Sequence, residues 1–218
     1  MEINDRNQFL NMAALFEGGL VVVAFGLGWF ADIDPVEHLN WQWQSFIWGL
    51  LAALPMFALF LIFHRYPIGP FRHINDFLVD FLGPVLSQCF WFDLILLGLL
   101  AGLTEEILFR GFFQAWFSQF GPGMGILGSN ILFGLVHFVT ATYAILAGLM
   151  GWYFSWLLTA TGETNLLVPI TTHAFYDYLA FLMVVRTYQK RSQLKQIDQP
   201  EQANSDSAEQ PTTGPDET

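Results

Sequence analysis

Residues 104–111 read Thr-Glu-Glu-Ile-Leu-Phe-Arg-Gly, and they place two carboxylates and one guanidinium inside a long apolar run. Residues 91–103 before them and residues 112–117 after them are dominated by Leu, Ile, Phe, Trp, Ala and Gly. An ionisable group at membrane depth costs roughly 2.5 kcal/mol or more, so three of them this close together need a structural or chemical reason. This stretch is therefore the first candidate for a functional site.

Helical periodicity separates the two glutamates of this stretch. With ~3.6 residues per turn, Glu106 and Arg110 lie one turn apart on the same helix face, where the arginine partly neutralises the glutamate. Glu105 points about 100° away from Glu106. The spacing thus predicts a Glu106–Arg110 pair and leaves Glu105 free for a separate role.

The composition is that of a membrane protein. Of 218 residues 54% are hydrophobic and 12% are charged, and the chain has 23 Phe and 8 Trp, which is not the mixture of a soluble domain. The formal charge of −11 is largely a property of the last stretch, which holds six of the acids, so nucleic acid is not an expected ligand. The single Cys89 excludes an internal disulfide framework and a Cys-rich metal site. The first residues lack signal-peptide features, so the first apolar run is predicted to stay as an anchor.

The apolar runs predict an all-α fold: a polytopic membrane helical bundle of about six transmembrane helices plus one interfacial helix. Residues 71–88 carry apolar and charged side chains at helical spacing, which indicates the helix on the membrane surface. Gly98 and Gly102 interrupt the third span and predict a tilt or kink there. The predicted spans are residues 9–30, 45–63 and 89–117, two short spans within 124–158 that split near 140–142, and residues 166–185.

Basic residues predict that both termini are cytoplasmic. Arg65 and Arg72 follow the second span, and four more Lys and Arg residues follow the sixth. The loops assigned to the other side are residues 31–44, 118–123 and 161–165, and they contain no Lys or Arg. This asymmetry is the one that the positive-inside rule describes.

Three units follow from the predicted spans and the composition. Residues 1–88 form two transmembrane helices and the interfacial helix, and residues 89–188 form a four-helix core that carries the polar motifs. Residues 189–218 are rich in Gln, Ser, Asp, Glu and Pro, with almost no large apolar side chains, and are predicted to be a disordered acidic tail in the cytoplasm.

Few polar side chains remain inside the spans, and they group at helical spacing. His137 lies one turn after Phe133, and Asp177 lies one turn after His173, so each pair shares a helix face. Together with residues 104–111 these pairs make three clusters on separate helices. The intramembrane polar residues are Glu17, Asp93, Glu105, Glu106, Arg110, Asn130, His137, His173 and Asp177.

If the three clusters face one cavity, they supply what peptide hydrolysis in a membrane requires: a base that activates water, groups that hold it, and a cation that balances the developing charge. The structural alternative is that each His or Asp joins two helices and that the Glu–Arg pair neutralises itself. The presence of three such clusters together favours a catalytic role over a structural one. Glu17 and Asp93 lie near the ends of their predicted spans, and a structural role is expected for both.

In chain order the motifs are Glu-Glu-x-x-x-Arg at residues 105–110, Phe-x-x-x-His at residues 133–137 and His-x-x-x-Asp at residues 173–177. This combination resembles the CPBP family of intramembrane endopeptidases, also called the Abi family. Its eukaryotic members include the enzyme that removes the last three residues of prenylated CAAX proteins. The likeness covers residues 93–183, and Asp177 stands where the family's third motif often has Asn.

The resemblance implies an endopeptidase in which Glu105 activates water together with His137. Members of this family are commonly called metalloproteases, while an alternative account needs no metal. The implied catalytic residues are Glu105, Glu106, Arg110, His137, His173 and Asp177.

The donor chemistry allows a metal at this site. Two imidazoles and a carboxylate, here His137, His173 and Glu106, suit a divalent ion, zinc above all, with one position open for water. The His-Glu-x-x-His signature of many zinc proteases is absent from the sequence. Metal-assisted hydrolysis is therefore the expectation, and metal-free water activation is the alternative.

Two further functions compete with proteolysis. A non-catalytic membrane scaffold or a bacteriocin-immunity-type protein would keep the polar core for stability, and a transporter would use its carboxylates as a proton relay. For the enzyme, the expected partners are membrane lipids and a membrane-associated or prenylated peptide. The sequence specifies no oligomeric state.

Overall fold

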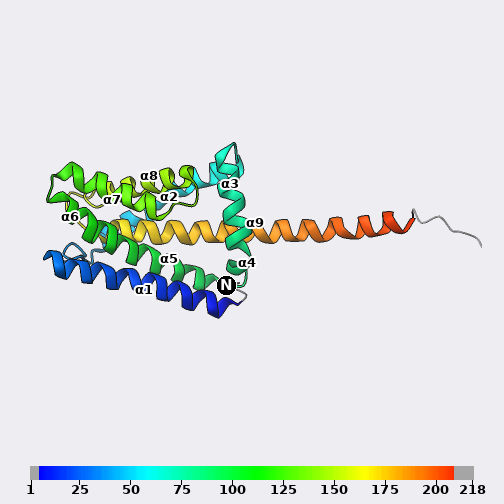
Figure 1. The fold of residues 1–218 in the computed structure, drawn as a ribbon, viewed down its shortest axis with the longest axis horizontal. Coiled ribbons are helices and arrows are strands. Elements are labelled where there is room, and N and C mark those ends of the chain that lie inside the picture. Colours follow the sequence, from blue (N-terminus) through cyan, green and yellow to red (C-terminus); the bar gives the residue numbers. More distant parts are fainter. Residues whose placement is uncertain (1–4, 209–218) are drawn as a thin grey trace, which may run out of the picture.

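The structure is a computed structural model that describes residues 5–208, and the regular elements in that range are all helical (Figure 1). This confirms the predicted all-α bundle. In chain order the elements are α1 (Arg6–Ala31), α2 (Trp43–Arg65), α3 (Pro70–Phe77), the π-helix η1 (Leu78–Leu82), α4 (Gly83–Leu86), α5 (Trp91–Glu106), the π-helix η2 (Ile107–Gln114), α6 (Ala115–Ser118), α7 (Pro122–Val136), α8 (Ala141–Leu157) and α9 (Leu167–Ala208).

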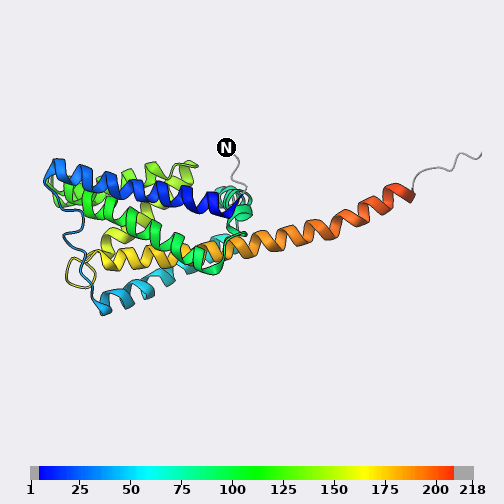
Figure 2. The ribbon, with the colours of Figure 1, turned by 90° about the horizontal axis from the view of Figure 1, so that it is seen from below.

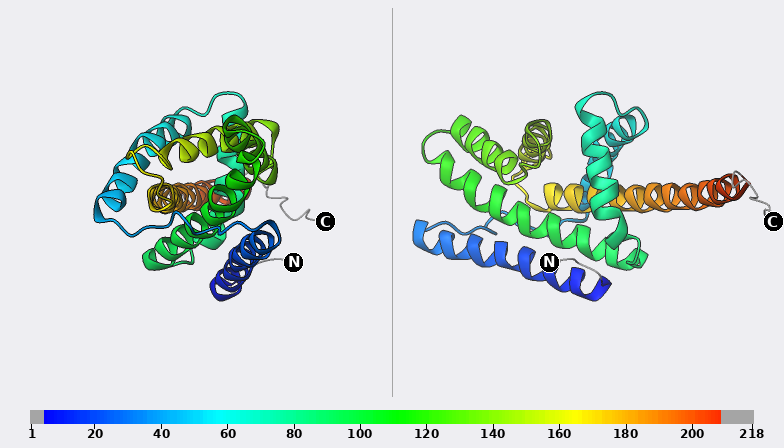
Figure 3. Two further views of the ribbon diagram at one scale, coloured as in Figure 1. Left: turned by 90° about the vertical axis from the view of Figure 1, so that its left-hand side faces the viewer. Right: turned by 45° about the vertical axis from the view of Figure 1, so that its right-hand side comes forward.

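Helix α9 runs through the middle of the bundle, and the other long helices surround it (Figures 1 and 3). In the turned view α1 and α2 lie on opposite sides of it (Figure 2). Small residues allow close contact: a Cβ added to Gly102 would lie 2.6 Å from the Ala174 nitrogen, and one added to Gly49 would lie 2.6 Å from Thr171 Cβ. Helices α5 and α2 therefore approach α9 backbone to backbone, as membrane helices do at glycine.

The third predicted span is one rod made of α5, η2 and α6, which follow each other without a break. The helix is continuous through Gly98 and Gly102, so neither glycine ends it, and the tilt or kink predicted there stays a prediction. Both glycines instead face α9, where a side chain would collide with the Ala174 backbone. The irregularity lies one turn later, in the π-helical segment η2, which directly follows Glu106.

The two short predicted spans are α7 and α8, which are separated where the sequence suggested. Helix α7 ends at Val136, and α8 starts at Ala141 with Thr140 as its N-cap. The Thr140 Oγ1 accepts a hydrogen bond from the Tyr143 backbone nitrogen at 3.1 Å, which satisfies one of the free N–H groups of the first turn.

The predicted interfacial segment is helical and crosses one end of the bundle (Figures 1 and 3). It consists of α3, η1 and α4, and ion pairs fasten it to α9. Arg191 Nη2 lies 2.9 Å from Asp76 Oδ1, and Arg191 Nη1 lies 3.4 Å from Asp80 Oδ1. The segment is therefore held against the charged continuation of α9.

The tail differs from its prediction within residues 189–208. The sequence predicted disorder from residue 189, but α9 continues to Ala208 and projects well beyond the bundle (Figure 1). Lengthening an existing helix needs no new nucleation step, and the Gln, Glu, Lys and Ala residues of this segment form helices well. Pro200 is the residue of this segment that has no N–H to donate. The prediction for residues 209–218 falls outside the described residues.

The outer surface of the bundle is apolar. By length and hydropathy, α1, α2 and residues 167–197 of α9 are each able to cross a membrane, and α7 contributes a shorter apolar helix. Large side chains such as Leu15, Trp29 and Phe30 are 80% exposed or more on this surface. Such a wide apolar surface is typical of contact with lipid.

Candidate active site

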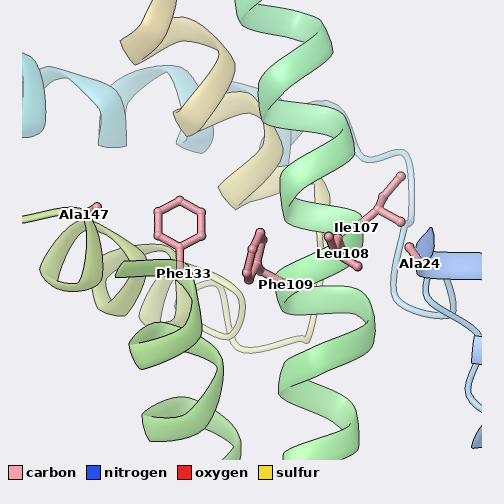
Figure 4. Close-up of a cluster of buried hydrophobic side chains, with 6 residues drawn as sticks. All are labelled: Ala24, Ile107, Leu108, Phe109, Phe133 and Ala147. Atoms are coloured by element: carbon pink, nitrogen blue, oxygen red, sulfur yellow. The ribbon is translucent and has the colours of Figure 1, made fainter. Parts of the chain in front are cut away.

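The three polar clusters meet at the middle of the bundle. Glu105 and Glu106 occupy the last two positions of α5, His137 directly follows α7, and His173 lies near the start of α9. The neighbouring floor is a packed apolar cluster in which Phe109 of η2 faces Phe133 of α7 at a centroid distance of 4.9 Å (Figure 4). The polar groups thus lie next to a buried, closely packed apolar cluster.

Glu106 is a buried hub. Its Oε1 accepts a hydrogen bond from Arg110 Nη1 at 3.2 Å and one from His173 Nδ1 at 2.9 Å. The residue is 0% exposed, so both interactions are shielded from solvent. The predicted Glu106–Arg110 pair is therefore present, and it also orients an imidazole from α9.

Arg110 is held on several sides. Its Nη2 donates to Asn130 Oδ1 at 3.1 Å and to the Gly151 carbonyl at 2.8 Å, and its guanidinium carbon lies 4.5 Å from the centroid of the Phe133 ring. A guanidinium over an aromatic face is favourable where water is excluded. Arg110 thereby connects η2 to α7 and α8 while it compensates the charge of Glu106.

Behind Arg110 a second set of polar side chains continues the network. Asn130 Nδ2 donates to Ser155 Oγ at 2.9 Å, and Ser155 Oγ donates to Gln114 Oε1 at 2.7 Å. Asn130 is recognisable in the sequence as an intramembrane polar residue, whereas Ser155 and Gln114 are not. No local spacing connects them, because they come from three separate elements.

Glu105 faces a different imidazole. Its Oε2 lies 3.7 Å from His137 Nε2, and the His137 Nδ1 donates to the Phe133 carbonyl at 2.8 Å. Because a carbonyl oxygen accepts hydrogen bonds and cannot donate them, that contact leaves the lone pair of neutral His137 on Nε2, toward Glu105. Oε2 of Glu105 is buried and has no hydrogen-bond donor among the described residues.

His137 and Glu105 lie at the same level of the bundle. After Glu105 the rod continues for about 20 Å, and α7 returns by a similar length before it ends at Val136. The short α7 therefore brings His137 back opposite Glu105.

The third cluster is also assembled. His173 Nε2 lies 3.5 Å from Asp177 Oδ2, one turn along α9, while Nδ1 of the same ring contacts Glu106. His173 stacks on Phe154 of α8 at a centroid distance of 4.7 Å. The imidazole is thus fixed between two carboxylates and an aromatic ring.

A cavity of about 250 Å³ opens in front of these groups. Glu105, His137, His173 and Asp177 contribute to its wall, and Glu106 and Arg110 lie behind it. The remaining wall is largely apolar and comes from α2, α3, η1, α7, α8 and α9. Four further polar residues of the wall were not predicted from the sequence, and they are His64, Asn75, Tyr143 and Tyr176.

The zinc ligands predicted from the sequence do not converge on one point. Glu106 Oε1 is engaged with Arg110 and His173, and His137 Nε2 faces Glu105 instead. Among the described residues, no group of three or more His, Cys, Asp or Glu side chains is arranged to hold a metal ion. The residues present therefore do not fit the predicted zinc site, and their arrangement favours the alternative that the sequence left open, which is water activation without a metal.

The two acids expected to be structural have different environments. Asp93 lies in the first turn of α5, accepts from the Phe90 nitrogen at 2.7 Å and forms a bidentate pair with Arg6, which agrees with a structural role. Glu17 lies near the middle of α1, not near its end, and Thr104 Oγ1 donates to it at 2.5 Å. The structural role expected for Glu17 was based on a position near the end of its span, and that position is wrong.

The fold and the site define an integral membrane protein with a buried cluster of carboxylates and imidazoles. Residues 87–179 match the model of the Rce1-like family, described as type II CAAX prenyl endopeptidase Rce1-like. The match contains all three motifs and confirms the resemblance that they suggested. It indicates a hydrolase of the protease class. The comparisons with curated proteins and with solved structures returned no match.

Proposed function

We propose that the protein is an intramembrane endopeptidase in which Glu105 and His137 activate the water that hydrolyses a peptide bond. The observation that carries this proposal is the pair of facing acceptors, Glu105 Oε2 and His137 Nε2, 3.7 Å apart at the cavity wall. That distance is too long for a direct hydrogen bond. A water molecule between the two atoms donates one hydrogen bond to each of them. These two hydrogen bonds orient the water for attack on the substrate.

In the proposed reaction Glu105 is the general base. It takes a proton from the water as the water oxygen bonds to the carbonyl carbon of the substrate. When the resulting tetrahedral intermediate collapses, the carbon–nitrogen bond breaks and the proton passes from Glu105 to the leaving amine. One water is consumed, and a carboxylic acid and an amine are formed, so Glu105 returns to its starting state.

His173 is proposed to stabilise the oxyanion. Its Nδ1 donates to Glu106 and its Nε2 lies at the cavity near Asp177. As an imidazolium between these two carboxylates, His173 carries a proton on both nitrogens, and the Nε2 proton is then available to the carbonyl oxygen. Preorganised donors of this kind commonly contribute a large part of catalysis. Glu106 and Arg110 lie behind the cavity wall. Glu106 orients His173, and Arg110 compensates the charge of Glu106.

The proposed substrate is a membrane-associated or prenylated peptide. Phe60 and Phe63 of α2 and Phe71 of α3 line the cavity together with Met56 and Leu59, so the wall next to the polar groups suits an apolar chain. The peptide part of the substrate is proposed to lie at the polar end of the cavity, next to Glu105 and His137. The family match, whose description names prenyl endopeptidases, supports this substrate class.

The proposed orientation puts both termini and the α3 end of the bundle in the cytoplasm. Arg65, Arg72 and Arg191 all belong to this end, as the positive-inside rule predicts. A peptide would then reach the cavity from the cytoplasm, and membrane lipids would surround its attached chain. Cysteine labelling in intact cells at the α2–α3 turn tests this: labelling from outside would refute it.

The test of the function uses proteoliposomes and a farnesylated peptide that ends in a CAAX sequence. We expect cleavage by the wild type and a loss of roughly a hundredfold or more in kcat for Glu105→Gln and for His137→Ala. Arg72→Gln is the control, because that side chain is largely exposed and outside the cavity wall. If both site variants fold and cleave like the wild type, the assignment is refuted. A wild type inactive on this and on other membrane peptides would favour the scaffold alternative.

A further inference from the structure

A carboxylate stands in the middle of the first helix, outside the segment that matches the family. Glu17 belongs to α1, which is otherwise apolar around it, and a carboxylate at this depth is costly without a partner. Its partner is the Thr104 hydroxyl, which donates to Glu17 Oε2 at 2.5 Å. Thr104 is 1% exposed and immediately precedes Glu105.

This contact is one of two polar connections that hold α1 and α5 in register. The first joins Arg6 to Asp93, and the second joins Glu17 to Thr104. Both connect residues 87 positions apart in the chain, so the two helices run parallel with one constant offset, as Figure 1 shows. The connections are about three turns apart on each helix, so both lie on the same face.

The two connections differ in what lies next to them. The Arg6–Asp93 pair is at the start of α5, far along the helix from the cavity. The Glu17–Thr104 pair is in the last turn of α5, where the backbone changes from α to π geometry after Glu106. On the opposite side of α5, Gly98 and Gly102 pack on α9 without a polar contact of their own. Rotation of this last turn is therefore restrained on the α1 side by the Glu17–Thr104 hydrogen bond.

Rotation of that turn decides where Glu105 points. Adjacent helical residues project about 100° apart, so a Thr104 that faces α1 directs Glu105 toward the cavity and His137. A small change at Thr104 would change the distance between Glu105 and His137, on which water activation depends.

We infer that Glu17 is a positioning residue, which acts through the Thr104 hydroxyl to hold Glu105 opposite His137. The inference rests on the proposed function of Glu105, and it adds a residue from α1 to a site whose motifs all lie within residues 87–179. Glu17 contacts neither the proposed water nor the cavity wall; it holds the turn that carries the base.

The kinetic test compares Glu17→Ala, Thr104→Val and their double variant on the farnesylated peptide. We expect each to lower kcat by roughly tenfold or more, with KM within twofold, and the double variant to be no worse than either single one, because the two side chains form one contact. Glu17→Gln retains an acceptor for the Thr104 hydroxyl and should restore most of kcat.

Arg6→Gln is the matched control, because it breaks the other connection of α1 and α5. It should lower the unfolding temperature and leave kcat within twofold of the wild type. Equal kcat losses for Arg6→Gln and Glu17→Ala would overturn the inference, since α1 would then act only as a packing element. Additive losses for Glu17→Ala and Thr104→Val would also overturn it.

A second measurement needs no substrate. In a Cys89→Ser background, Glu105→Cys and His137→Cys are joined by a short bifunctional thiol reagent, and the rate of cross-linking reports how these two positions face each other. Adding Glu17→Ala or Thr104→Val should slow cross-linking severalfold, and adding Arg6→Gln should not. If the wild type cleaves no peptide, the proposed function fails, and unchanged cross-linking would separately refute the positioning role.

Discussion

Replacement of Arg110 by methionine should destabilise the protein strongly. The change removes the ion pair with Glu106, the hydrogen bonds to Asn130 and to the Gly151 carbonyl, and the contact with the Phe133 ring. Methionine fills a similar volume, so the loss is chiefly electrostatic. Glu106, which is 0% exposed, would then keep a buried charge balanced by His173 alone.

The magnitude follows from these contacts. Removal of one partner from a buried pair costs about 3–5 kcal/mol, because the remaining charge is left uncompensated. The acceptors on Asn130 and Gly151 each lose one hydrogen bond to a charged group, which is worth about 1.5–3 kcal/mol and overlaps with the first figure as the site relaxes. We expect a loss of about 3–5 kcal/mol in the free energy of unfolding for Arg110→Met.

The assay is unfolding by SDS in mixed micelles, followed by far-UV circular dichroism. Glu106→Gln combined with Arg110→Met removes both charges and should recover part of the loss, because no unpaired ion remains. The control is Arg72→Met, which breaks another ion pair at the same helical spacing but with a side chain 74% exposed, and should change stability by less than about 1 kcal/mol. A loss below about 1 kcal/mol for Arg110→Met, or a double variant no more stable than the single one, would refute the reasoning.

Three further predictions concern packing, metal and the tail. Gly102→Ala should cost about 1–3 kcal/mol in the same unfolding assay, because its Cβ would lie 2.6 Å from the Ala174 nitrogen. Gly19→Ala is the control and should not destabilise the protein, because nothing lies within 4 Å of its added Cβ. Equal stability of the two variants would contradict the close packing. Dialysis against a strong chelator should leave cleavage of the farnesylated peptide unchanged, because the predicted zinc ligands do not converge. A loss of cleavage that zinc restores, together with one zinc per chain by elemental analysis, would establish metal assistance instead. Deletion of the residues after Arg191 should leave kcat and KM within twofold, because the cavity and the Arg191 ion pairs are retained; a large loss would assign the tail a part in catalysis.

Much of the architecture could be predicted from the sequence, because the signals are local. The apolar composition predicted a membrane bundle, and the break near residues 140–142 predicted where α7 and α8 separate. The pairs within the motifs were predictable for the same reason. Glu106 with Arg110 and His173 with Asp177 are each four residues apart, and the helical repeat alone places them on one face.

Other features depended on contacts that local spacing does not encode. The glycines at 98 and 102 look like helix breaks in the sequence, and they became the contact surface for α9. The charged segment after residue 188 looked disordered, and it extends an already formed helix as far as Ala208. In the first case the neighbouring helix gives the glycines their role, and in the second case the preceding helix supplies the nucleus that an isolated segment lacks.

The sequence by itself determined which side chains are rare and costly in a membrane, and therefore which residues require partners. The tertiary structure decided the partners: Glu105 faces His137, Glu106 faces His173, and Glu17 reaches Thr104 across two parallel helices. The physical reason is that a helix fixes the angle between its own side chains but not its rotation against its neighbours. That rotation is set by backbone contacts at glycines and by hydrogen bonds between helices far apart in the chain.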